Sequence, residues 1–418
     1  MKKRLIILIL FVFSFFSFEN IAFSKLSEIT KEKSYCNATD LINYFIPDRK
    51  IESIKITFNN ERKWSKNLFN ALISPSQDIQ AKFKKKFKAS LAVTFIGGIT
   101  CDFSAKIRFS GDKRDHIIRV GGKIISSMDV EINENINGVT KFKLFLPHTK
   151  KNENEIFITA LLNNLGYLSA RTEKIKRINI SGKEHPYLFS ESVHRKEFLE
   201  QNNRNEGPIL SLDEFYIMNS NPKFNEILIA RIRNSKWIKD DNQKFKKSVK
   251  ALTFLNYHFI NIAERNKPLI NPTNGMEKIF FEENSLERKK FMEYMVLIHA
   301  LATYSHLAEG DLRFYFNPMI EKFEIIYNDG FSTIMGIPKK IKYNLLNKDM
   351  QIVTPSLINQ IDSIDKDKFR NELRIRGLIL DEKKLIKLFN KITDRIKKIR
   401  NFKKFSKNDE KYYVNNFD

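Results

Sequence analysis

The chain has 418 residues, of which 42% are hydrophobic, and this is enough apolar material for one large domain or two medium ones. Its formal net charge of +24 and pI near 9.7 suit a nucleic acid, an anionic envelope surface or a phosphorylated ligand. The charge is spread along the chain, and no Lys/Arg block alternates with aromatic residues, so no nucleic-acid partner is expected. Scattered histidines and the absence of a Cys-x-x-Cys motif also argue against a Cys/His metal site.

The first 24 residues have the order of a secretory signal peptide. Three cations at positions 2–4 precede an apolar run at 5–13, and small residues at 22–24 offer a cleavage site. The run is short for a membrane-spanning helix, although an uncleaved anchor is the alternative. We therefore expect an exported protein that starts near Lys25 and resides in the periplasm, at the cell surface or outside the cell.

The chain contains only two cysteines, Cys36 and Cys101, and both follow the expected cleavage site. In an oxidising compartment they can form one disulfide, which closes a long loop and stabilises the fold by up to about 4 kcal/mol. Two buried thiols are the alternative. Pairing requires Cα atoms within about 7 Å of each other.

Residues 51–147 are expected to form an antiparallel sheet. Short runs rich in β-branched and aromatic residues are separated there by glycine turns. One turn, Gly121-Gly122-Lys123, could cradle a phosphate through its backbone N–H groups, but an ordinary hairpin explains it equally well. The strand-like runs are 51–58, 91–95, 105–109, 117–120, 128–132 and 142–146, and a short helix is expected at 64–73.

A helix at 155–165 and two strands at 173–180 and 187–190 follow, and the chain is mainly helical after Glu191. Long helical patterns occur at 242–264, 285–304 and 381–405. The last pattern sets a basic face against an apolar stripe. This helix could lie on anionic lipid, but a helix packed on the core with a solvated outer face is the favoured interpretation.

Three polar residues in the last third of the chain have the order of a phosphoryl-transfer site. Asp311 follows a long helical pattern, Asn317 comes six residues later, and Asp329 precedes a glycine at the end of a strand-like run at 323–327. Carboxylate and amide oxygens are suitable ligands for Mg²⁺, and one aspartate can orient an attacking hydroxyl. The spacing alone is weak, because Asp-Gly is also common in hairpin turns and an aspartate often caps a helix.

Taken together, these segments resemble the CotH family of atypical protein kinases, first known from spore coats. The resemblance spans nearly all of the chain after residue 24 and rests on the order of five features. They are an Ile-x-Ile strand followed by Trp64; the segment 107–111; the helix 155–165 leading to Ala170-Arg171; the segment 178–182 leading to Ser190-Glu191; and the stretch from Asp311 to Asp329.

This resemblance implies an α+β, two-lobed, atypical kinase-like fold that binds ATP with Mg²⁺ or Mn²⁺ and phosphorylates a protein. An antiparallel β-rich N-lobe would span residues 25–190, and a mainly helical C-lobe would span 191–418. Asp311 would be catalytic, and Asn317 and Asp329 would bind metal. The candidates for nucleotide binding are Arg108, Lys123, Lys143 and, at the hinge between the lobes, Glu191.

The chain departs from the family pattern at two places. The strand at 126–131 lacks the lysines that usually enter it, and the family's D-x-D metal motif is reduced to Asn328-Asp329. ATP is also scarce outside the cytoplasm. The alternative function is therefore an inactive kinase fold that serves as a surface module for an anionic glycan or protein, and membrane contact through the basic tail helix is a further expectation. A Lys or Arg facing Asp329 would favour the kinase.

Overall fold

The computed structural model describes much of the chain after the N-terminal region. The described residues are 36, 50–76, 78–212, 230–239, 241–264, 281–282, 285–307, 311–343, 346 and 348–402. The expected signal peptide at 1–24 lies outside these residues. No helix in the described part of the chain is both long enough and apolar enough to span a membrane.

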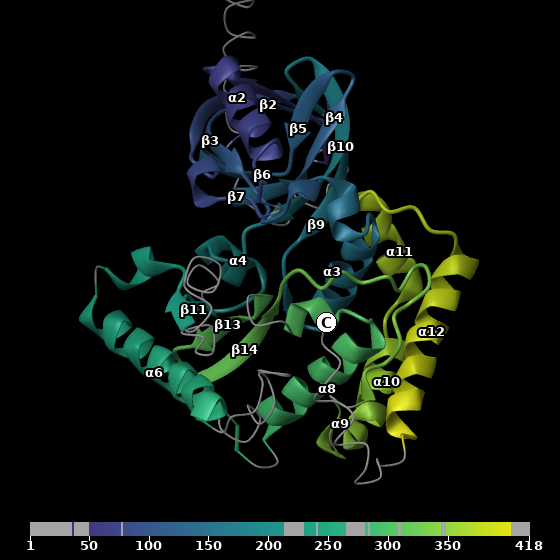
Figure 1. The fold of residues 1–418 in the computed structure, drawn as a ribbon. Coiled ribbons are helices and arrows are strands. Elements are labelled where there is room, and N and C mark those ends of the chain that lie inside the picture. The colour runs from purple at the N-terminus through teal and green to yellow at the C-terminus, as the bar shows by residue number, and fades with distance from the viewer. Residues whose placement is uncertain are drawn as a thin grey trace, which may run out of the picture.

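The first part of the chain forms a closed barrel of seven strands (Figure 1). Neighbouring strands are antiparallel except at the closure, where β1 and β9 run parallel. Sequence periodicity predicted the strands but not this closure. In order around the barrel the strands are β1 (Ile51–Phe58), β2 (Phe87–Phe95), β3 (Thr100–Phe109), β6 (Met128–Ile136), β7 (Val139–Phe145), β10 (Lys183–Glu191) and β9 (Thr172–Ile180).

The barrel interior is filled by the apolar residues, which alternate with exposed residues along the strands. In β1, for example, Ile54, Ile56 and Phe58 are buried while the residues between them are exposed. Helix α2 (Glu61–Leu72) begins at Asn60, whose side chain accepts a hydrogen bond from the Lys63 backbone, and buries Trp64 against Phe58. A separate hairpin, β4 (Ile117–Val120) and β5 (Lys123–Ser126), lies beside this helix.

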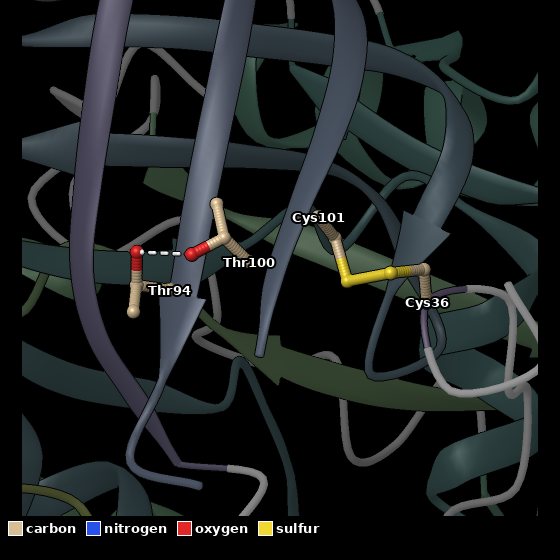
Figure 2. The surroundings of a disulfide bond; sticks show 4 residues. All are labelled: Cys36, Thr94, Thr100 and Cys101. Carbon is tan, nitrogen blue, oxygen red and sulfur yellow. Dashed lines mark hydrogen bonds between the residues drawn. A yellow bond between two sulfur atoms is a disulfide. The ribbon is translucent and has the colours of Figure 1, made fainter. Parts of the chain in front are cut away.

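A disulfide joins Cys36 to Cys101 at the start of β3, with Cα atoms 5.6 Å apart (Figure 2). This separation satisfies the geometric requirement for pairing. The hydroxyl of Thr100, the residue before Cys101 on β3, is hydrogen-bonded at 3.0 Å to that of Thr94 on the neighbouring strand β2. The disulfide therefore connects the N-terminal segment to the wall of the barrel.

Between β7 and β9 the chain leaves the barrel and contributes to the second lobe. Helix α3 (Asn154–Asn164) is buried on nearly all sides in the C-terminal core, and β8 (Leu168–Ser169) pairs in parallel with β14 (Lys322–Tyr327). The expected lobe boundary at residue 190 does not describe this excursion. Because a helix without a polar face needs partners all round, α3 packs among the C-terminal helices rather than on the barrel surface.

The second lobe consists of a five-stranded sheet with helices around it (Figure 1). The basic helix α12 (Glu382–Arg400) buries its apolar stripe in this core, as expected for a packed terminal helix. Contact of its basic face with a membrane stays a prediction. The other elements are β12 (Ala230–Ile232), β11 (Ile209–Leu212), β13 (Arg313–Asn317), α4 (Lys196–Gln201), α6 (Asn242–Glu264), α8 (Leu286–Ala300), α9 (Lys348–Ile352), α10 (Thr354–Asp362) and α11 (Lys366–Ile375).

The protein therefore has an α+β fold with a β-rich first lobe and a mainly helical second lobe. In the following sections the barrel lobe denotes residues 50–152 and 172–191, and the C-terminal lobe denotes the remaining described residues from 153 onward.

Candidate functional site

The two lobes meet at an ion pair between Lys150 and Asp329. Lys150 ends a short 3-10 helix, Pro147–Lys150, that follows the last residues of β7, and Asp329 follows β14. The Lys150 ammonium lies 2.6 Å from Asp329 Oδ2, and its side chain is only 6% exposed. It also lies 4.2 Å from the centre of the Phe145 ring. A cation thus faces Asp329, the feature expected to favour a kinase, but sequence reasoning did not identify Lys150 as its source.

The second carboxylate oxygen of Asp329, Oδ1, is buried and has no hydrogen-bond partner among the described residues. A buried, charged oxygen without a donor is costly unless a cation or another ligand satisfies it. Because Lys150 occupies Oδ2, Oδ1 is the atom through which Asp329 can bind a ligand.

The backbone on both sides of this ion pair is strained. Lys151 and Asn152 have φ angles of +54° and +57°, and Asp329 and Phe331 have φ angles of +53° and +49°. The left-handed region is costly for residues with a Cβ, and such residues cluster at functional sites. Gly330 is required for space, since a Cβ there would lie 2.3 Å from the Tyr327 hydroxyl.

Asp311 lies beside this segment. The Asn328 side-chain amide donates to Asp311 Oδ1 over 3.5 Å, the outer limit of a hydrogen bond. The Asn328 backbone N–H is 3.1 Å from Nδ1 of buried His306, and His306 Nε2 is 2.7 Å from the Tyr294 hydroxyl. Burial lowers the pKa of His306 to about 4, so the ring is neutral and can accept this hydrogen bond. This connection holds Asn328 between Asp311 and Asp329.

Asn317 does not join the two aspartates, which corrects the expectation that all three converge. Asn317 ends β13 and pairs with Lys322 at the start of β14, while Arg313 pairs with Ile326 at the other end of the hairpin. The four residues from 313 to 317 place it about 13 Å along the strand from Arg313, at the end of the hairpin opposite to Asp311 and Asp329. Its side chain instead accepts a hydrogen bond from the Met319 backbone in the turn.

Lys143 is the predicted nucleotide-binding cation that lies near the site. Its ammonium is 5.4 Å from the centre of the Phe145 ring, the same ring that Lys150 contacts. Burial is the main cause of its lowered pKa; Lys150 and Arg313 add to the effect, and Asp129 and Asp329 oppose it. Within the described part of the chain its ammonium has no hydrogen-bond or ion-pair partner, so it is available to a ligand.

The other predicted cations contact different groups. Arg108 lies 2.6 Å from Asp129 Oδ2, and Lys141 lies 3.8 Å from the same oxygen. Lys123 donates to the Ser181 carbonyl and lies 3.7 Å from Glu61 on α2. The nucleotide-binding roles assigned to Arg108 and Lys123 stay predictions, and neither residue forms an ion pair with Asp329 in the described structure.

Glu191 ends β10, where the chain leaves the barrel for the C-terminal lobe. Its buried carboxylate accepts a 2.6 Å hydrogen bond from the Arg171 backbone N–H, and the Glu191 backbone N–H donates to the Arg171 carbonyl. Burial raises the pKa of Glu191, while Arg171 opposes the rise. These bonds connect the two strand ends that join the lobes, a position compatible with the expected hinge.

His194, which sequence reasoning missed, lies among cations of both lobes. Burial lowers its pKa well below the ordinary value, and the nearby charges of Arg313, Arg233, Lys143 and Lys141 lower it further. Lys141 and Lys143 belong to the barrel lobe, and Arg233 and Arg313 belong to the C-terminal lobe. We call these four residues the interlobe cations; their charges act together on His194.

Glu155, on the first turn of α3, is a second missed residue. Its buried carboxyl accepts a 3.2 Å hydrogen bond from Tyr327, the residue two before Asp329. Burial raises the pKa of Glu155 to about 7, Asp329 adds to the rise, and Lys150 opposes it. The sequence signal was a glutamate at the start of a largely apolar helix, five residues after Lys150.

No protein-family model and no curated protein sequence matches the chain. Solved structures do match it, among them the crystal structure of a Helicobacter pylori proinflammatory kinase, CtkA. The similar structure is a kinase. The similarity has a TM-score of 0.34 and 12% sequence identity, and it covers 66% of this chain and 92% of that one. A similarity at this level does not assign a family, so the functional argument rests on the site itself.

Proposed function

We propose that this protein is a CotH-like, metal-dependent phosphotransferase that moves phosphate from ATP to a hydroxyl group of a protein. The observation that carries the proposal is the unsatisfied Asp329 Oδ1, in a carboxylate that is paired with Lys150 and acts electrostatically on Lys143. A hard carboxylate oxygen would suit a divalent metal, and the nearby ammonium groups would suit the phosphate groups of a nucleotide.

The described residues can supply only part of the ligand shell of such a metal. They contain no group of three or more His, Cys, Asp or Glu side chains able to hold an ion. Mg²⁺ or Mn²⁺ would therefore bind through Asp329 Oδ1, with phosphate oxygens and water completing its shell, and would neutralise charge on the phosphates. This arrangement makes metal binding dependent on the nucleotide.

The protein groups have separate tasks in this proposal. Lys150 holds Asp329 in place through Oδ2, and the interlobe cations, of which Lys143 is one, attract the phosphate chain. Asp311 orients the acceptor hydroxyl and accepts its proton, and Asn328 positions Asp311. The expected export would place the reaction outside the cytoplasm, on an envelope or secreted protein.

The alternative is a catalytically inactive fold that binds an anionic glycan or protein at the cell envelope. It is favoured by one observation, that the described residues contain no group of three or more His, Cys, Asp or Glu side chains able to hold a metal ion. In that case the interlobe cations would serve to bind the anionic partner. No nucleic-acid partner is proposed.

The test is phosphate transfer from γ-labelled ATP with Mg²⁺ or Mn²⁺, using Asp311→Asn and Asp329→Asn as paired variants. We expect Asp311→Asn to keep nucleotide binding and lose transfer, and Asp329→Asn to lose metal-dependent binding. Nucleotide binding without transfer by the wild-type protein would favour the inactive fold. Absence of both would contradict the kinase.

A further inference from the structure

A cavity of about 430 Å³ lies in the C-terminal lobe, and neither Lys150 nor Asp329 lines it. Its walls come from β14, from α8 and from the segment that joins α3 to β8, and they include no residue of the ion pair. A volume of this size suits a small organic molecule. The proposed phosphotransfer does not use this cavity.

Glu293 of α8 gives the cavity a buried negative charge. The residue is 2% exposed, and its Oε1 atom has no hydrogen-bond partner in the described part of the chain. The ammonium of Lys289 is 3.9 Å from Oε1, which is too far for a hydrogen bond, and the Lys289 side chain is about half exposed. A carboxylate so deeply buried needs a donor, which a ligand can supply.

Tyr167 provides a second unsatisfied group in the same wall. Its hydroxyl is buried without a hydrogen-bond partner among the described residues, and burial together with the Glu293 charge raises its pKa, so it stays protonated. The Tyr167 ring lies 5.3 Å from the Tyr294 ring, and buried Phe291 also lines the cavity. Aromatic faces stabilise a cation placed over them.

The other charged residues that line the cavity are paired with a partner or are less buried than Glu293. Arg204 lies 2.7 Å from Glu324, and Lys322 lies 3.5 Å from Glu282, so each has a carboxylate partner. Exposed lysines such as Lys289 are screened by solvent, whereas the buried carboxylate is not.

We propose that this cavity binds a small organic molecule with a primary ammonium group on an apolar body. The three N–H donors of an ammonium can satisfy both Glu293 Oε1 and the Tyr167 hydroxyl, while the aromatic walls hold the apolar part. A neutral molecule of the same shape would not supply this charge, and an anionic one would be repelled by the Glu293 carboxylate.

The test compares three isosteric probes by isothermal titration calorimetry: phenethylammonium, 2-phenylethanol and phenylacetate. We expect the affinity for phenethylammonium to be at least about tenfold higher than that for the other two probes. Glu293→Gln should weaken its binding by about tenfold or more, and Tyr167→Phe should weaken it by about threefold. Glu287→Gln removes a charge from a less buried lining position of the same helix and should change binding by less than about twofold.

The proposal is overturned if the three probes bind alike, or if phenethylammonium does not bind. It is also overturned if folded Glu293→Gln binds phenethylammonium as the wild type does. If Glu293→Gln does not fold, the probe series on the wild-type protein and the Tyr167→Phe variant decide the question. All these measurements use protein without nucleotide, so their outcome is separate from that of phosphate transfer.

Discussion

Replacing Lys150 by methionine tests the ion pair that joins the two lobes. Methionine keeps the length and the apolar stem of the side chain but removes the charge, leaving both Asp329 oxygens without a cation. Breaking a fully buried pair costs about 3–5 kcal/mol. Because the Asp329 side chain is 26% exposed and water can solvate part of it, we expect a smaller loss of unfolding free energy, about 2 kcal/mol.

The assay is urea unfolding at neutral pH, where a lower midpoint with an unchanged slope reports a change in stability. Lys151→Met is the matched control. It removes an exposed charge one residue away and should change stability by no more than about 0.5 kcal/mol. In the double variant Lys150→Met/Asp329→Asn both charges are removed, so its loss should be smaller than the sum of the single losses by about 1 kcal/mol or more.

Two results would refute this reasoning. One is a Lys150→Met variant as stable as the Lys151→Met control. The other is strict additivity of the Lys150 and Asp329 substitutions, which would mean that the two side chains do not interact in solution.

Three further predictions concern buried groups and the disulfide. Because burial raises the pKa of Glu155 from 4.5 to about 7, the stability it provides in its protonated form is lost as the pH rises through this interval. The glutamine side chain does not titrate. The unfolding free energy of Glu155→Gln, measured with urea and taken relative to the wild type, should therefore rise by about 3 kcal/mol from pH 4.5 to about pH 7. The pKa of His306 is lowered to about 4, so its ring NMR signals should stay unchanged from about pH 8 to about pH 5.5. Reduction of the disulfide that spans 65 residues should cost about 4 kcal/mol in unfolding free energy, whereas a Cys36→Ser/Cys101→Ser variant should not respond to reductant.

Each of these predictions has a clear contrary outcome. A Glu155→Gln difference that does not vary with pH would show that the carboxyl titrates normally. A His306 signal that moves near neutral pH would show that the ring is solvated, and equal stability of oxidised and reduced protein would mean that the disulfide does not constrain the unfolded chain.

The sequence predicted the elements whose burial follows a simple period. The alternating residues of β1 and the apolar stripe of α12 both appear where periodicity places them, because each element has one face on a core. Closure of the barrel was not predictable in this way. It depends on parallel pairing between β1 and β9, which are far apart in the sequence and carry no local signal for one another.

For the candidate site, too, the sequence predicted local features but not contacts between residues far apart in the chain. Asp329 at a strand end was predictable from the strand pattern and the following glycine. Asn317 was misassigned because spacing along the chain does not show that Asn317 lies at the turn of the β13–β14 hairpin, whereas Asp311 and Asp329 lie beyond its opposite end. Lys150 was missed because its partner lies far along the chain, and only the fold brings the two together.

The most direct test of the central claim is the binding of ATP to the purified protein by calorimetry, with and without Mg²⁺. We expect binding that requires the metal, is lost in Asp329→Asn, weakens by about tenfold in Lys143→Met and is unchanged in Asn317→Ala. Binding that ignores the metal, or that Asp329→Asn leaves intact, would contradict the assignment of Asp329 Oδ1 as the metal ligand and with it the proposed phosphotransferase.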